Sequence, residues 1–72
     1  MTSIQSGQIL RLCETVQGIP PGFYVFLGEA LVTAKLCLVG EDKDGDLCKT
    51  DQYMKVHIEF LDLFTPVGIT ID

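Results

Sequence analysis

Tyr53-Met54-Lys55-Val56-His57-Ile58-Glu59-Phe60 is the stretch that decides the fold class, because polar and apolar residues alternate along its whole length. Successive side chains of a β-strand point to opposite faces of a sheet, so the pattern predicts one face packed on a core and one face in water. We therefore expect a strand over residues 53–60.

The preceding segment, residues 29–39, allows two interpretations. At helical spacing lie Leu27, Leu31, Ala34 and Leu38, and Ala and Leu favour helices. In the strand interpretation Ala34, Leu36 and Leu38 face inward, whereas Lys35, Cys37 and Val39 face outward. We favour a strand over 34–41, because Asp44-Gly45 predicts a turn and residues 47–50 supply a partner strand for a hairpin.

Two further strands are predicted upstream, over residues 8–16 and 23–27. The first strand places Leu10 and Leu12 on one face, and the second is an aromatic and β-branched run between two glycines. Between them, the Pro-Pro-Gly sequence at 20–22 predicts a stiff loop. Downstream of the hairpin, Asp51-Gln52 predicts a tight connection into the strand over 53–60.

These segments predict an all-β fold, a five-stranded, mainly antiparallel small barrel or strongly bent sheet. The alternative is an α+β fold with a helix at about 29–39. Closing or bending a sheet reduces its exposed edges. The predicted core comprises Leu10, Leu12, Val25, Leu27, Leu36, Leu38, Met54, Val56, Ile58 and Phe60.

The length of 72 residues predicts a single domain. Residues 1–7 are small and polar and are predicted to form a flexible N-terminus. Residues 8–64 would form the small barrel. Residues 65–72 would be a C-terminal tail or a short edge strand.

The charge balance is acidic, with ten Asp and Glu residues against five Lys and Arg residues. A nucleic-acid binder of this size normally has a basic face that neutralises phosphates, and the basic residues here are scattered. Anionic membrane surfaces are disfavoured for the same reason. The apolar segment 23–40 is interrupted by Glu29 and Lys35, whose charges would be costly in lipid. We therefore expect no nucleic-acid partner and no membrane partner.

The three cysteines, Cys13, Cys37 and Cys48, form no closely spaced pair. An odd number of cysteines without a secretory signal predicts reduced thiols and a cytoplasmic protein. Zinc accepts Cys and His ligands, but structural zinc sites use ligand pairs at short spacing, so these thiols and His57 predict no zinc site. Nothing in the sequence places a nucleophile and an orienting carboxylate beside His57, so we expect neither an enzyme nor a cofactor.

Residues 41–46 form the local charge cluster of the chain. A calcium loop with Gly45 at its sixth position would need Asp or Asn at position 40 and Glu at position 51, and the chain has Gly40 and Asp51. We interpret the cluster as a hairpin tip whose Asp side chains accept backbone hydrogen bonds. Binding of calcium or zinc in a structural or regulatory role is the alternative function.

The predicted function is a protein-binding or assembly module with an acidic surface. Tyr24, Phe26 and Tyr53 are assigned to outward or sideways faces, and small barrels bind peptides through aromatic grooves near their loops. The acidic cluster would steer the chain toward a basic partner. The candidate partner-binding residues are Tyr24, Phe26, Glu41, Asp42, Asp44, Asp46 and Tyr53.

The chain presents, in this order, Gly7-Gln8-Ile9-Leu10-Arg11-Leu12, a Pro-Pro-Gly loop, Phe23-Tyr24-Val25, Asp44-Gly45-Asp46-Leu47 and Val56-His57-Ile58-Glu59. This layout, which covers residues 8–64, resembles that of Src-homology-type small barrels. The peptide-binding members carry an Ala-Leu-Tyr-Asp-Tyr stretch and a Trp, which this chain lacks, so the resemblance implies no proline-rich ligand. The segments 18–28 and 45–51 also resemble short uncharacterised proteins of photosynthetic bacteria, which implies no activity.

Overall fold

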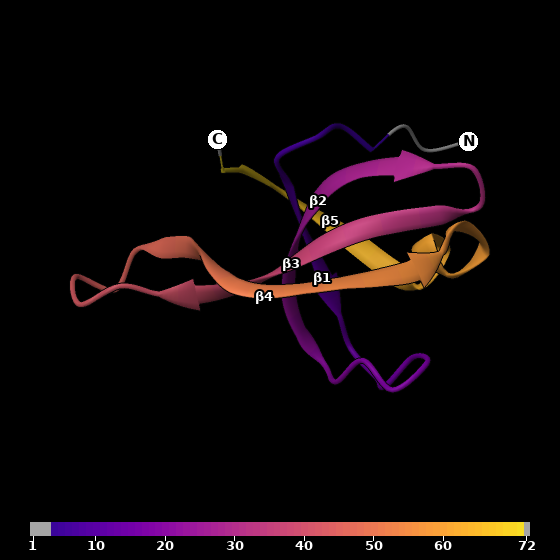
Figure 1. Cartoon of the computed structure of the whole chain (residues 1–72). Coiled ribbons are helices and arrows are strands. Elements are labelled where there is room, and N and C mark those ends of the chain that lie inside the picture. Colours follow the sequence, from indigo (N-terminus) through magenta and orange to yellow (C-terminus); the bar gives the residue numbers. More distant parts are fainter. Residues whose placement is uncertain (1–3, 72) are drawn as a thin grey trace.

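The computed structural model describes residues 4–71, most of which lie in one antiparallel sheet (Figure 1). The elements are β1 (Gln8–Leu12), β2 (Gly22–Ala30), β3 (Thr33–Glu41), β4 (Leu47–His57), the 3-10 helix η1 (Ile58–Leu63) and β5 (Phe64–Thr70). The strand order β4-β3-β2-β1-β5 leaves β4 and β5 at the two edges. The prediction of an all-β, five-stranded fold is confirmed in its bent-sheet form, because the sheet does not close into a barrel.

Strand β3 resolves the ambiguity over residues 29–39, and the helical interpretation is wrong. β3 pairs with β2, where Ala34 lies opposite Glu29, and with β4, where Leu36 lies opposite Met54. Both of its edges are therefore hydrogen-bonded, and Ala34, Leu36 and Cys37 are buried. Sheet pairing on both sides outweighs the modest helix propensity of Ala and Leu.

Strand β4 differs from its prediction at both ends. It begins at Leu47 and continues through residues 51–52, so no separate connection precedes Tyr53. It ends at His57, whose Nδ1 accepts a hydrogen bond from the Glu59 amide at 3.2 Å and caps η1. The Ile58 amide donates to the Val32 carbonyl at 2.9 Å. Residues 58–60 therefore form a helical turn, although their sequence alternates as a strand does.

The main hydrophobic core lies on one face of the sheet, under η1. Its buried residues are Leu10, Leu12, Val16, Ile19, Tyr24, Phe26, Ala34, Leu36, Val56 and Phe64. Of the predicted core, Leu38, Met54, Ile58 and Phe60 pack against this cluster and are partly buried. The remaining two predicted residues, Val25 and Leu27, belong to a second cluster.

That second cluster occupies the opposite face and has Ile9, Val25 and Cys37 at its centre. The prediction that Val25 and Leu27 share a face with the main core is wrong. Cys37 lies on the face opposite Leu36, as predicted, but this face is covered and Cys37 is buried. Where both faces of a strand bury apolar side chains, the sequence pattern does not show which face packs on the main core. β2 turns two of its aromatic residues, Tyr24 and Phe26, toward the main core, whereas Phe23 is exposed.

The two ends of the described chain meet at Gly7. Its amide donates to the Phe26 carbonyl at 2.7 Å, and its carbonyl accepts from the Ile71 amide at 2.7 Å. Of the N-terminus predicted to be flexible, residues 1–3 lie outside the described residues. The C-terminal segment forms β5, which pairs with β1 along one edge. Within residues 4–71, no helix has the length and apolar character required to cross a bilayer.

Candidate functional site

The hairpin between β3 and β4 extends away from the rest of the molecule and ends at residues 42–46 (Figure 1). Asp42 organises this tip, because its Oδ1 accepts hydrogen bonds from the amides of Asp44 and Asp46, both at 2.9 Å. The Asp42 carbonyl accepts from the Gly45 amide at 3.0 Å, and Gly45 has φ +83°. The predicted tip, with an Asp side chain accepting backbone hydrogen bonds, is confirmed.

The tip concentrates negative charge. Carboxylate oxygens of Asp42, Asp44 and Asp46 lie within 4.8 Å of one another, and all three residues are exposed. Glu41 is exposed beside them. Within residues 4–71 none of these carboxylates lies within 4 Å of a Lys or Arg nitrogen. A cation held here would need further oxygen ligands from water, because calcium takes six to eight.

The zinc-type ligands lie apart. Cys13 is exposed in the loop after β1, whereas Cys37 is buried and its Sγ donates to the Thr50 carbonyl at 3.1 Å. In the described part of the chain, no three of Cys13, Cys37, Cys48 and His57 come close enough to share a metal ion. Of the three thiols, Cys37 packs within the sheet as a small apolar side chain.

The aromatic part of the predicted binding surface is not formed. Tyr24 is fully buried in the main core, so its predicted contact with a partner is wrong. Phe26 is 5% exposed and lies on the core side of β2, not on the outward face that was predicted. Tyr53 is 59% exposed on β4, with the Lys35 ammonium 5.4 Å from its ring centroid. On the other face of β2, where the prediction placed Tyr24 and Phe26, the side chains are those of Val25 and Leu27.

Tyr24 instead fixes the loop that precedes β2. Its hydroxyl donates to the Pro20 carbonyl at 2.5 Å, and its ring packs edge-to-face on Phe64 with centroids 6.0 Å apart. Burial raises the pKa of the Tyr24 hydroxyl above 10.0, because the ionised form is poorly solvated in the core. Tyr24 is therefore a structural residue that links the 13–21 loop to β5.

Tyr24→Phe should lower the free energy of unfolding by about 1–2 kcal/mol, because the Pro20 carbonyl loses its donor. The raised pKa of Tyr24 also makes the free energy of unfolding depend on pH. The contribution of the protonated hydroxyl is complete below the pKa of an unfolded tyrosine, about 10, and is lost as the pH rises through the pKa of Tyr24 in the folded chain. Urea unfolding at about pH 8 and about pH 11 should show this alkaline loss in the parent chain and a smaller one in the variant. Tyr53→Phe, at an exposed ring, serves as the control and should leave stability nearly unchanged; an equal loss in both variants would contradict the role of Tyr24.

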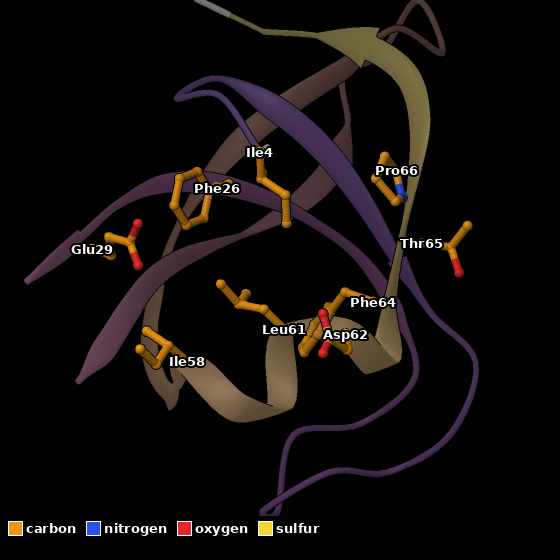
Figure 2. Close-up of a pocket in the computed structure, with 9 residues that line it drawn as sticks. All are labelled: Ile4, Phe26, Glu29, Ile58, Leu61, Asp62, Phe64, Thr65 and Pro66. Atoms are coloured by element: carbon orange, nitrogen blue, oxygen red, sulfur yellow. The ribbon is translucent and has the colours of Figure 1, made fainter. Parts of the chain in front are cut away.

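A pocket that the sequence did not predict opens between β2, η1 and β5 (Figure 2). Its volume is about 480 Å³, which lies in the range of small-ligand sites. The lining residues are Ile4, Phe26, Glu29, Ile58, Leu61, Asp62, Phe64, Thr65 and Pro66. Six of them are apolar and two carry carboxylates, and no Lys, Arg or His lines the pocket.

The two carboxylates lie on different sides of the apolar floor. Figure 2 shows Glu29 at the left of the pocket and Asp62 lower and nearer the centre, with the side chain of Leu61 between them and those of Phe26 and Ile4 above. Glu29 also borders a smaller cavity of about 330 Å³ that Lys35 and Lys55 line. No ion pair within 4 Å joins Glu29 or Asp62 to a basic residue in the described part of the chain.

Sequence reasoning missed this pocket because its walls are far apart in the chain. Glu29 lies in the segment that was ambiguous between helix and strand, and Asp62 lies in η1, which the alternating pattern partly assigned to a strand. The available signal was the loss of alternation after Phe60. A turn at that point returns the chain across the open face of the sheet.

Comparison of the chain with protein-family models, with curated proteins and with solved structures finds no significant match. Function is therefore inferred from two features of the molecule. One is the acidic tip of the β3–β4 hairpin, and the other is the apolar pocket with its two carboxylates.

Proposed function

We propose that this chain is a protein-binding or assembly module whose acidic hairpin tip steers it toward a basic partner. The observation that carries the proposal is the concentration of unpaired, exposed carboxylates on a projecting hairpin. The net charge of −5 extends the same field over the whole molecule. Charge complementarity of this kind acts mainly on the rate of association.

The roles of the three aspartates differ, and this difference supports the proposal. Asp42 is needed for the turn, since its carboxylate accepts two backbone hydrogen bonds. Within the described chain the side chains of Asp44 and Asp46 accept no such hydrogen bond, so their charges are not required by the local structure. The resemblance to Src-homology-type small barrels points to the same class, but without the Trp of the peptide-binding members it names no ligand.

The test is the double variant Asp44→Lys/Asp46→Lys, which reverses the charge of the tip and leaves Asp42 to hold the turn. A partner captured from native extract of the source cells should associate at least about tenfold more slowly with this variant at low salt. The difference should shrink as salt screens the charges. Glu14→Lys/Glu59→Lys makes the same change in net charge at exposed positions elsewhere and should slow association far less. Equal rates for the two double variants would refute steering by the tip.

The second candidate function is cation binding by the same three carboxylates, and the observation that favours it is their mutual distance of at most 4.8 Å. The variants distinguish the two functions. Calcium-dependent shifts of the residue 42–46 amides that Asp44→Asn/Asp46→Asn abolishes, together with unchanged partner association, would assign the tip to a cation instead of a protein. Zinc can be titrated in the same way.

A further inference from the structure

The pocket between β2, η1 and β5 combines an apolar lining with negative charge. Apolar side chains from each of these elements and from Ile4 form the floor, and Glu29 and Asp62 stand on different sides of it (Figure 2). Both carboxylates are exposed, so a neutral apolar ligand would gain no attraction from them, and an anionic ligand would be repelled. A ligand that carries a positive charge on an apolar body satisfies both parts of the lining.

The walls of the pocket are held by contacts within the chain. The hydrogen bond of 2.9 Å from the Ile58 amide to the Val32 carbonyl ties the start of η1 to the turn between β2 and β3. At the other end, Phe64 is buried and packs on the Tyr24 ring. The site is therefore formed before any ligand binds, and little ordering of the protein opposes binding.

The turn joined to the pocket carries an exposed apolar tip. Leu31 is 97% exposed and has φ +57°, a backbone conformation that favours glycine, and Val32 beside it is 54% exposed. An exposed leucine in a strained conformation is unfavourable in the isolated chain, and such features gather at interaction sites. The positive φ belongs to the two-residue turn between β2 and β3, and contact of Leu31 and Val32 with a bound partner would account for their apolar exposure. A ligand that reaches this tip must extend beyond the pocket, as a chain segment does and a small amine does not.

We propose that the pocket and the Leu31-Val32 tip together bind a segment of a partner protein that carries a Lys or Arg between apolar residues. The apolar residues of the segment pack against Phe26, Leu61 and the tip. The stem of the basic side chain lies along the apolar floor, and its charged end reaches Glu29 or Asp62. This site is separate from the acidic hairpin, so the inference does not depend on the steering role proposed for residues 42–46.

The experiment is an amide chemical-shift titration of the full chain with the peptide acetyl-Leu-Leu-Lys-Leu-Leu-amide and with its matched glutamine version. The lysine peptide should shift the amides of residues 26–32 and 58–65. Its affinity should exceed that of the glutamine peptide about fivefold, the effect expected of a pair of exposed charges. Equal affinity of the two peptides, or no shift at these amides, would overturn the inference.

Two double variants with the same change in net charge complete the test. Glu29→Gln/Asp62→Asn should abolish the preference for the lysine peptide while its thermal unfolding matches that of the parent chain, because both side chains are exposed. Asp44→Asn/Asp46→Asn should keep the preference. Loss of the preference in the hairpin variant alone would overturn the pocket proposal. Slower association with the basic partner in the hairpin variant bears only on the steering proposal, so the two ideas fail independently.

Discussion

Leu36→Ala should lower the free energy of unfolding by about 2–5 kcal/mol, the usual cost of truncating a fully buried leucine. Leu36 is 0% exposed and lies in β3, opposite Phe26 of β2 and Met54 of β4. Both neighbouring strands are fixed by their own hydrogen bonds, so the space left by the side chain cannot close easily. A chain of 72 residues has a total stability of about 4–11 kcal/mol, and the variant should therefore be partly unfolded under mild conditions.

Urea unfolding followed by circular dichroism measures this loss, and Leu31→Ala is the matched control. It removes the same atoms from a side chain that is 97% exposed, so its effect should stay within about 0.5 kcal/mol. If the two alanine variants lost stability equally, the main core would not lie on the face of β3 that carries Leu36.

Gly7→Ala should cost about 2–5 kcal/mol, although residue 7 lies outside the predicted domain. Gly7 has φ +93°, which disfavours any residue with a Cβ, and a Cβ placed there would lie 2.8 Å from the Ile71 carbonyl oxygen. That oxygen belongs to the backbone and cannot move without displacing the chain that leads out of β5. The two hydrogen bonds of Gly7, to Phe26 and Ile71, would be strained together.

Gly18→Ala separates the two causes. Gly18 has a similar φ of +81°, but no atom lies within 4 Å of the position of its Cβ, so only the conformational cost of about 1–2 kcal/mol applies. Urea unfolding gives both values, and hydrogen exchange at the Ile71 amide should accelerate only in Gly7→Ala. A loss in Gly7→Ala no larger than that in Gly18→Ala would show that the approach to Ile71 is unimportant.

The hairpin shows how far local sequence reaches. Asp42 and Gly45 form their turn through contacts within five residues, and the strands on either side have β-forming patterns, so the turn and its acidic tip follow from the sequence. The position where β4 ends does not follow from the sequence, because Ile58 and Phe60 continue the alternation of polar and apolar residues. The strand stops there because the Ile58 amide bonds to the distant Val32 carbonyl and His57 caps η1.

The candidate sites divide in the same way. The acidic residues Glu41, Asp42, Asp44 and Asp46 were found because they are adjacent in the chain. Tyr24 and Phe26 were placed on the wrong side because β2 buries both of its faces. The pocket was missed because Glu29 and Asp62 come to line one cavity only through the tertiary fold.

The sequence by itself determined the all-β character of the chain, the tight turn at Asp42 and the negative charge, since each depends on residue types or on side chains within a few residues of one another. Only the tertiary structure decided which face of β2 joins the main core, where β4 gives way to η1, and that Gly7 must lack a side chain. Those outcomes depend on contacts between segments remote in the chain. Their energies arise from packing and pairing across the sheet, which no local pattern records.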